Sequence, residues 1–413
     1  MYHTEELQME KKKQKKWMRF RHRVVRNIAW AVLYPYTRLV YGVQAVPFRQ
    51  QGNRPYLILM NHQTPFDQFF VGISFKGPVY YLATEDIFSN GWVSSLIRWL
   101  VAPIPIKKQT TDAGAVMNCI RLAREGGTIA IAPEGNRTYS GRTEYMNPAI
   151  GGLAKKLKLP IALYRIEGGY GVQPRWSDVT RRGKMRAYVS RVIEPEEYAN
   201  WTAAELFAQI REGLYVNEGC LDGCFESNKK AEYLERAIYV CPDCGLSEWE
   251  SQGNECRCTS CGKTIIYGAD KKITGKECDF PFDFVVDWYD YQQEFVNNLD
   301  LNPYIEIPMF RDHAALSEVI VYHRKEKLRQ DASIALYGDR IVIDEGQESE
   351  MVFPFSQTQA VAVLGRNKLN IYFGDHVYQF KGSKRFNALK YVNIYHRYKN
   401  ISRGDENGKF LGL

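Results

Sequence analysis

A histidine and an aspartate five residues apart are the first residues in this sequence whose types and spacing could carry out chemistry. His62 and Asp67 follow the apolar, strand-like run Tyr56–Met60, in the stretch MNHQTPFDQFF. A histidine beside a carboxylate can take a proton from a hydroxyl group, because the carboxylate orients the ring and stabilises the imidazolium that forms. The pair alone is weak evidence, since a chain with seven histidines easily contains this spacing by chance.

A second polar loop follows another apolar run about seventy residues further along the chain. Its sequence is APEGNRT, residues 132–138, and it contains Glu134, Gly135 and Arg137. One interpretation of this stretch is a surface turn with an Arg–Glu ion pair, because Pro-Glu-Gly at a strand end is not rare. However, loops that leave the carboxyl ends of strands in one sheet can form a common site. The two loops together therefore predict a single pocket.

The elements that must position these loops alternate along the chain. Between residues 54 and 216, short apolar runs predict strands and helical periodicity predicts helices between them. Such alternation indicates an α/β layer with a mostly parallel sheet, which binds ligands at the carboxyl ends of its strands. The predicted strands are Tyr56–Met60, Val79–Ala83, Thr128–Ala132, Ile161–Ile166 and Arg186–Ile193, and the predicted helices are Asp112–Arg124, Pro148–Leu157 and Ala203–Leu214.

Four short blocks, in their order along the chain, resemble motifs of the glycerolipid acyltransferases, the family of the lysophosphatidic acid acyltransferases. Residues 61–67 are similar to the His-x4-Asp block of that family, and residues 133–137 are similar to its Phe-Pro-Glu-Gly-Thr-Arg block. APIPIKK at 102–108 and LPIAL at 159–163 are similar to two further blocks. The resemblance covers about residues 50–215. It implies a PlsC-like fold and transfer of an acyl group to a lysophospholipid.

Three positions depart from the family's motifs. Ala132 stands where the family usually has Phe, Asn136 where it has Thr, and Lys108 where it has Arg. A lysine lacks the two-pronged guanidinium, so it holds phosphate less directionally. Lysophosphatidic acid is the expected acceptor, with glycerol-3-phosphate or another lysophospholipid as the alternative. From another class of protein, the alternative is a membrane scaffold on a catalytically lapsed acyltransferase fold.

The residue types indicate how such a reaction would run. The sequence has no serine of the nucleophile-elbow type and no cysteine positioned near the histidine, so we expect the acceptor hydroxyl to attack a thioester directly. His62 would act as general base, and Asp67 would hold its second ring nitrogen. The donor would be acyl-CoA or acyl carrier protein, and no catalytic cofactor is expected.

The second loop would bind the acceptor. Arg137 would clamp its phosphate, because a guanidinium can meet two phosphate oxygens at once. Lys108, and less directly Lys107, would add positive charge. Glu134 would orient Arg137 or accept a hydrogen bond from a glycerol hydroxyl, and Gly135 would let the backbone come close to the ligand.

Four cysteines give the strongest single signal in the sequence. Cys241, Cys244, Cys258 and Cys261 have the spacing C-x2-C-x13-C-x2-C, and a glycine follows each second cysteine. This arrangement predicts a structural zinc ribbon with four thiolate ligands and no open position for catalysis. Disulfides are the alternative, which a reducing cytosol disfavours. Cys256, two residues before Cys258, could compete for one ligand position.

The net charge of +8 is concentrated near the N-terminus. Residues 11–26 contain nine Lys and Arg and no acid, with Trp17, Phe20 and Val24 at helical spacing. This pattern predicts an amphipathic helix or helix pair on an anionic membrane surface; a solvated helix packed on its own domain is the alternative. No apolar run is long enough to span a bilayer, and we recognise no export signal. We therefore expect a cytoplasmic protein, peripheral to the inner face of the cell membrane. With the remainder nearly neutral and the ribbon rich in acids, nucleic acid is not an expected partner.

The last third of the chain predicts a small β-rich domain. Hairpins around Gly338-Asp339 and Gly374-Asp375, followed by a helix at about Lys384–Lys399, are typical of a small barrel such as a pleckstrin-homology or GRAM module. The predicted division of the chain is an N-terminal membrane-contact segment, an acyltransferase domain, the zinc ribbon with its flanks, and this β-rich domain. Their ranges are 1–50, 51–216, 217–275 and 276–413. A protein partner would bind through the ribbon or the last domain.

Overall fold

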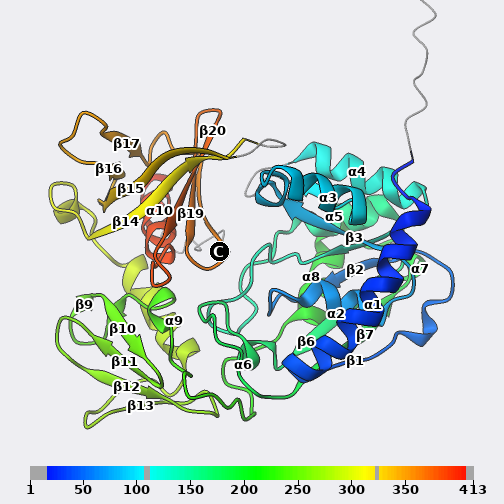
Figure 1. The fold of residues 1–413 in the computed structure, drawn as a ribbon, viewed down its shortest axis with the longest axis horizontal. Coiled ribbons are helices and arrows are strands. Elements are labelled where there is room, and N and C mark those ends of the chain that lie inside the picture. The colour runs from blue at the N-terminus through cyan, green and yellow to red at the C-terminus, as the bar shows by residue number, and fades with distance from the viewer. Residues whose placement is uncertain (1–15, 107–111, 321–324, 406–413) are drawn as a thin grey trace, which may run out of the picture.

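The structure is a computed structural model that describes residues 16–106, 112–320 and 325–405. Figure 1 shows two halves side by side: an α/β half, blue to green, and a second half, green to red, that contains two further sheets and a long C-terminal helix. Thin connections between the halves come from the segment around α6.

The first half is built on a seven-stranded sheet with the order β1-β7-β6-β2-β5-β3-β4. Neighbouring strands are parallel except β6 and β7, which are antiparallel. The predicted α/β fold with a mostly parallel sheet is therefore confirmed. The strands are β1 (Val43–Ala45), β2 (Leu57–Met60), β3 (Val79–Thr84), β4 (Ile104–Ile106), β5 (Thr128–Ile131), β6 (Ile161–Glu167) and β7 (Met185–Ile193).

Helices cover both faces of this sheet, which explains why its central strand β2 is apolar and buried at every position. Leu57 and Leu59 of β2 pack in one core with residues of α4, α5 and α8. Tyr56 and Ile58 pack in a second core on the other face, with residues of α1 and α2. The helices are α1 (Phe20–Tyr41), α2 (Asp67–Ser74), α3 (Trp92–Val101), α4 (Ala113–Arg124), α5 (Ala149–Leu157), α6 (Gly169–Val172), α7 (Pro195–Tyr198) and α8 (Ala203–Leu214).

Helix α1 runs unbroken through Pro35, as a single helix rather than a pair. One side of it packs on the domain: His22 Nδ1 lies 3.0 Å from the hydroxyl of Tyr80, and Arg26 donates to the carbonyl of Gly72 at 3.1 Å. In the part of the chain that the structure describes, no helix is both long enough and apolar enough to cross a bilayer.

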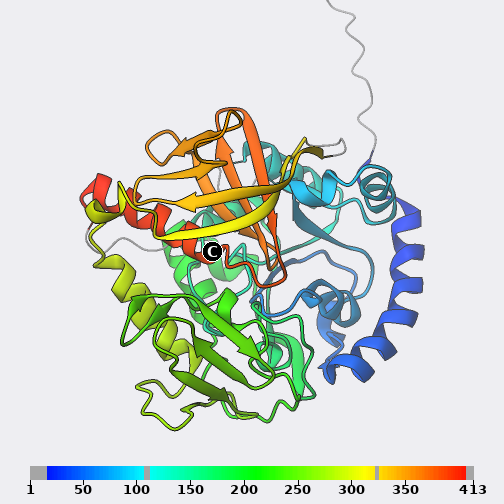
Figure 2. The same ribbon diagram turned by 60° about the vertical axis from the view of Figure 1, so that its left-hand side comes forward.

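The second half has two layers, which Figure 2 shows one above the other. A four-stranded antiparallel sheet and a short two-stranded ribbon hold the cysteines, and α9 joins them to a seven-stranded antiparallel sheet. The elements are β8 (Val240–Cys241), β9 (Gly245–Leu246), β10 (Trp249–Gln252), β11 (Glu255–Cys258), β12 (Thr264–Tyr267), β13 (Ile273–Gly275), α9 (Val285–Asn297), β14 (Phe310–Glu318), β15 (Glu326–Leu336), β16 (Arg340–Ile343), β17 (Met351–Pro354), β18 (Ala360–Leu364), β19 (Lys368–Phe373), β20 (His376–Gly382) and α10 (Leu389–Arg403).

The two predicted hairpins are present as β15–β16 and β19–β20. The closing helix, in contrast, begins five residues later than expected. Asn387 precedes it, and its side-chain oxygen accepts the backbone N–H groups of Leu389 and Lys390 at 2.9 and 3.3 Å. Asparagine in this position satisfies N–H groups that a helix start leaves unpaired, so it sets the first turn.

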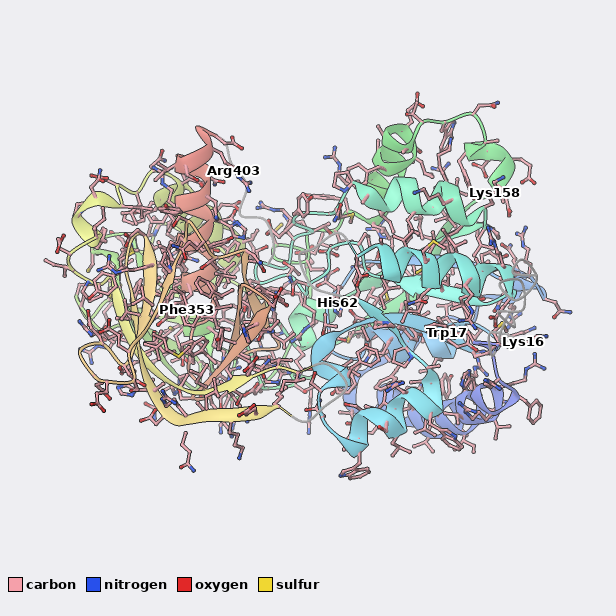
Figure 3. The ribbon with its side chains drawn as sticks, turned by 90° about the horizontal axis from the view of Figure 1, so that it is seen from above. Lys16, Trp17, His62, Lys158, Phe353 and Arg403 are labelled. Atoms are coloured by element: carbon pink, nitrogen blue, oxygen red, sulfur yellow. The ribbon has the colours of Figure 1, made fainter. Side chains whose placement is uncertain are left out.

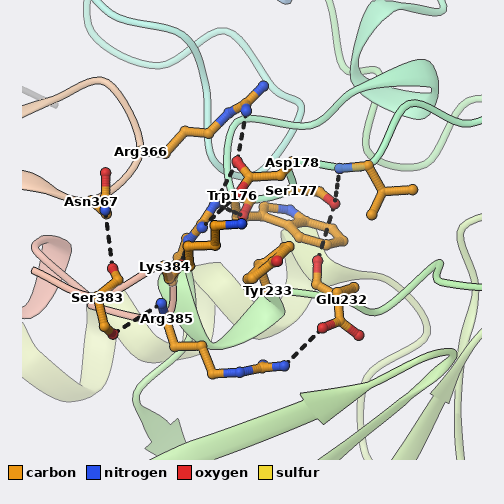
Figure 4. A network of polar contacts seen from close by, with 12 residues as sticks. Trp176, Ser177, Asp178, Glu232, Tyr233, Arg366, Asn367, Ser383, Lys384 and Arg385 are labelled. Carbon is orange, nitrogen blue, oxygen red and sulfur yellow. Dashed lines mark hydrogen bonds and ion pairs between the residues drawn. The ribbon is translucent and has the colours of Figure 1, made fainter.

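The halves share one apolar core. Tyr139 and Trp176, both from the α/β half, are buried in the cluster that also contains Trp249, Trp288 and residues of the C-terminal sheet. Polar contacts between the halves surround this core, and Figure 4 shows part of that network. Because the halves bury side chains together, the C-terminal sheet and the catalytic loops have a fixed relation to each other.

Candidate active site

The loop after β2 brings His62 and Asp67 together. His62 Nδ1 lies 2.7 Å from Asp67 Oδ2. The loop is fixed at its start by Asn61, whose side chain both donates to and accepts from the backbone of Ile166 in β6, at 2.8 Å each. His62 lies on the side of the α/β half that faces the second half, as the top view in Figure 3 shows.

Asp67 is the first residue of α2, and it is fully buried. It accepts the backbone N–H of Gln63 at 2.7 Å and of Thr64 at 3.0 Å, and the Thr64 hydroxyl at 2.6 Å. A carboxylate only accepts hydrogen bonds, so Nδ1 of His62 is the donor in their contact. This leaves Nε2 with its lone pair, on a side chain that is 24% exposed.

The loop after β5 is tied directly to the histidine loop. Glu134 Oε1 accepts the backbone N–H of His62 at 2.9 Å, and the backbone of Glu144 donates to the same carboxyl group. Part of the Glu134 residue is exposed, but its carboxyl group is buried, and this burial raises its pKa to about 8. Glu134 therefore joins the two loops, and the roles expected for it from the sequence stay predictions.

Gly135 adopts a positive φ of 70°, which explains the residue type. No described atom lies within 4 Å of the position that a Cβ would take, and the expected approach of this backbone to a ligand stays a prediction. The turn it makes carries the chain from Glu134 to Arg137.

Arg137 is 9% exposed, and its Nη1 has no hydrogen-bond partner among the described residues. Burial, together with the positive charges of Arg175 and Arg366, lowers the pKa of this guanidinium to about 9. The negative charge of Asp67 acts in the opposite direction, which places Arg137 near the His62–Asp67 pair. The structure thus brings the imidazole and the guanidinium to one region. Lys107 and Lys108 lie outside the described residues.

One residue of this site carries no sequence signal. Arg175 is buried, and its Nη1 donates to the main-chain carbonyl of Arg137 at 2.8 Å. Its guanidinium stacks over the ring of Tyr139, 4.3 Å from the ring centroid. Arg175 belongs to no motif and lies 38 residues from its partner, so only the fold reveals it.

The four predicted metal ligands form a cluster of their own in the second half. The sulfur atoms of Cys241, Cys244, Cys258 and Cys261 all lie within 4.8 Å of one another. The Cys241 and Cys261 sulfurs are 3.8 Å apart, which is about the edge of a tetrahedron with Zn–S bonds of ~2.3 Å. Cys256 is buried and stands outside this group. All nine cysteines are free, so the structure contains no disulfide.

The chain is similar in sequence to known acyltransferases. Residues 39–164 match the family model described as Acyltransferase. A 1-acyl-sn-glycerol-3-phosphate acyltransferase of Bacillus subtilis (strain 168) is 22% identical over 176 residues, which are 42% of this chain and 83% of that protein. A chloroplastic 1-acyl-sn-glycerol-3-phosphate acyltransferase of Brassica napus is also 22% identical, over 42% of this chain and 51% of its own length.

Among solved structures, the crystal structure of the 1-acyl-sn-glycerophosphate (LPA) acyltransferase PlsC from Thermotoga maritima is similar at 19% identity. The match covers 48% of this chain and 80% of that one, with a TM-score of 0.39.

The family match and the names of these relatives give the class: the protein is an O-acyltransferase. Within this class the chain is similar to the PlsC-like 1-acyl-sn-glycerol-3-phosphate acyltransferases, so the resemblance seen in the sequence is confirmed. The matches with these two relatives each cover 42% of the chain, and the remainder lies outside them.

Proposed function

We propose that the protein transfers a fatty acyl group from acyl-CoA or acyl carrier protein to the sn-2 hydroxyl of lysophosphatidic acid, giving phosphatidic acid. The observation that carries this proposal is the junction of the two loops. Glu134 binds the backbone of His62, so the loop that holds the His62–Asp67 pair is fixed to the loop that holds Arg137. The names of the relatives in Bacillus subtilis and Brassica napus describe the same reaction.

In this mechanism His62 is the general base and Asp67 is the residue that positions it. As the acceptor hydroxyl attacks the thioester carbonyl, its proton moves to Nε2 of His62. The new C–O bond forms, the C–S bond breaks, and the leaving thiolate takes the proton back from the imidazolium. Arg137 binds the phosphate of the acceptor, and its buried Nη1 is a donor without a partner among the described residues.

The test is an assay of the purified protein with labelled acyl-CoA and acyl carrier protein donors against a panel of acceptors. We expect the highest kcat/KM with lysophosphatidic acid. A higher value for glycerol-3-phosphate or for another lysophospholipid would replace the acceptor but keep the chemistry. If no acceptor is acylated with either donor, the protein is a membrane scaffold on an inactive acyltransferase fold.

We infer that α1 and α3 form the surface that contacts the membrane. Apolar side chains are exposed on both helices, among them Phe20 on α1 and Trp92 and Trp99 on α3, which are 79%, 76% and 54% exposed. A cavity of about 610 Å³ beside them is lined by Lys16, Trp17, Arg19, Arg21 and Arg98 together with Trp99 and other residues. Interleaved cations and tryptophans of this kind favour the interface of an anionic bilayer.

Sedimentation with vesicles tests this surface. We expect binding to phosphatidylglycerol vesicles that exceeds binding to phosphatidylcholine vesicles and weakens as salt increases. Trp92→Ser should weaken binding, whereas Ile401→Ser, which removes an exposed apolar side chain from α10, should not. Equal binding by wild type and Trp92→Ser would exclude α3 from the contact.

We also propose that the four-cysteine cluster binds one structural zinc ion. The four sulfurs are close enough to serve as ligands of one ion, and thiolates are preferred ligands of zinc. Elemental analysis should find about one zinc per chain, lost in Cys244→Ser and kept in Cys220→Ser, which changes an exposed cysteine outside the cluster. A metal-free wild type with full stability would contradict the proposal.

We propose a pleckstrin-homology or GRAM-like fold for the C-terminal domain. Its antiparallel strands follow the order β17-β16-β15-β14-β20-β19-β18, and α10 packs on β18. The division of the chain into ranges 1–50, 51–216, 217–275 and 276–413 also remains a proposal, supported by the separate sheets. An experimental structure of the full chain would test both.

A further inference from the structure

The C-terminal sheet reaches the loop after β5, here named the acceptor loop, at the end of strand β18. Arg175 donates to the carbonyl of Arg137 through Nη1, while its Nη2 lies 3.5 Å from the carbonyl of Val363 in β18 and 3.3 Å from the side-chain oxygen of Asn136. Arg175 therefore binds the loop after β5 and the C-terminal domain at the same time. The turn that joins β18 to β19 follows directly after this contact.

This turn directs a further arginine toward the α/β half. Arg366 lies in the turn, and its Nη1 is 2.6 Å from Oδ1 of Asp178, a residue of the segment after α6 (Figure 4). The charge of Arg366 acts on Arg137 and on Tyr41. The ring of Tyr41 packs on Phe66, with centroids 4.7 Å apart, and Phe66 immediately precedes Asp67. Arg366 therefore lies three residues after Val363, whose carbonyl Arg175 approaches while it also bonds the carbonyl of Arg137.

The charges in this region do not balance. Arg175 links the other two arginines: it bonds the carbonyl of Arg137 at 2.8 Å and approaches the carbonyl of Val363, which precedes Arg366 by three residues, at 3.5 Å. Of the nearby carboxylates, Asp67 is already bonded to the histidine loop, and Asp178 is shared between Arg366 and Arg236, which lies 3.0 Å from it. The buried Nη1 of Arg137 has no partner among the described residues. A buried, unpaired cation is costly, and a bound anion would remove that cost.

We propose that the β18–β19 turn of the C-terminal domain completes the acceptor site, and that Arg366 binds the phosphomonoester of the acceptor together with Arg137. Arg175 acts as a positioning residue that holds the acceptor loop against β18. This inference rests on the proposed function and adds to it a specificity-determining residue from a domain outside the matched acyltransferase region. The C-terminal domain is then part of the active site as well as of the scaffold.

The experiment compares Arg366→Gln, Arg366→Lys and Arg385→Gln in the full-length protein. Arg385 is the matched control, because it also lies in the C-terminal domain and forms ion pairs, with Glu232 at 2.7 Å and with Glu235. We expect Arg366→Gln to raise KM for lysophosphatidic acid about tenfold, as loss of a charge-assisted hydrogen bond would. Its kcat and its KM for acyl-CoA should stay near wild type. Arg366→Lys should recover part of the affinity, and Arg385→Gln should keep the wild-type KM.

Other outcomes would overturn the inference. A wild-type KM for lysophosphatidic acid in Arg366→Gln would exclude the contact. A rise only in KM for acyl-CoA would assign Arg366 to the phosphates of the donor, and an equal rise in Arg385→Gln would reduce its role to holding the domains together. Absence of turnover by the wild type would contradict the proposed function itself. Even then, the increase in Tm on adding inorganic phosphate tests the anion site, and an equal increase for wild type and Arg366→Gln would exclude it.

Discussion

The two loops of the active site differ in how completely their polar groups are paired. In the loop after β2, the Asp67 carboxylate is buried and accepts hydrogen bonds from three neighbouring residues, one of them His62. In the loop after β5, the buried guanidinium of Arg137 keeps one nitrogen without a partner among the described residues. The first loop is organised without a ligand, whereas the second holds a charge that the phosphate of the acceptor would pair in the proposed function. A mutation of Asp67 in the first loop should therefore lower the free energy of unfolding. A mutation of Arg137 in the second loop should weaken binding of the acceptor without lowering the free energy of unfolding.

The largest expected effect is that of His62→Ala on acyl transfer. We expect kcat to fall by about 10²–10⁴-fold, the usual contribution of a general base, with Tm unchanged. His376→Ala is the control, because His376 is exposed and pairs with Glu318 in the C-terminal domain. Steady-state kinetics with thermal unfolding of both variants checks this expectation, and wild-type turnover in His62→Ala would remove the general-base assignment.

Asp67→Asn should reduce both activity and stability. An amide cannot accept all the hydrogen bonds that reach this buried carboxylate, so we expect the free energy of unfolding to drop by about 1–3 kcal/mol. Acyl transfer should fall by about 10²-fold or more, because His62 loses the group that fixes its tautomer. Urea unfolding beside kinetics would show both effects. Unchanged stability would mean that the bonds to Asp67 contribute nothing net to the fold.

Arg137→Gln should lower the affinity for the acceptor without lowering the stability of the protein. We expect KM for lysophosphatidic acid to rise by about 10–100-fold, since a charge-assisted contact to phosphate is lost. The free energy of unfolding should stay equal or increase, because the variant no longer buries an unpaired charge. A marked loss of stability in urea, comparable with that of Asp67→Asn, would show that both loops are organised in the same way and would end the comparison.

The smallest expected effect is a pH dependence at Glu134, which joins the loops. Burial raises its pKa from 4.5 to about 8, so the native state keeps a proton that the unfolded chain releases above pH 4.5. Stability of the wild type should therefore decline as pH rises from about 4.5 to 8, relative to Glu134→Gln, which does not titrate. We expect a relative change of at least about 1 kcal/mol between pH 5 and pH 8, measured by urea unfolding of both proteins. Parallel stability curves would contradict the raised pKa.

The strands and loops that carry the site could be predicted because they depend on local patterns. The apolar runs that become β2 and β5 are typical of strands that helices cover on both faces of a sheet. The polar residues after these runs mark the strand ends. The predicted helix Ala203–Leu214 matches α8 in full, since Thr202 and Glu205 form a capping box that the sequence displays. The C-terminal helix was misplaced because Asn387 caps it from a position that periodicity does not mark.

The contacts between distant segments could not be predicted in the same way. Glu134 binds the backbone of His62, and a backbone N–H has no signature in the sequence. Arg175 reaches Val363 across 188 residues, and Arg366 reaches Asp178 over the same separation. Arginines in loops are common, so the residue type of Arg175 and Arg366 indicates nothing until the fold shows what they contact.

The shared core has a consequence for how the enzyme can be divided. Trp176 is fully buried although it belongs to the α/β half, and its ring packs on that of Tyr267 from later in the chain, with centroids 5.7 Å apart. A fragment ending near residue 216 would expose the indole ring of Trp176 and the phenol ring of Tyr139 to water. Such a fragment would aggregate or remain partly unfolded. Ribosomes must therefore finish the whole polypeptide before the catalytic half reaches its mature form, and proteases that cut after the first domain should destroy activity rather than release an active core.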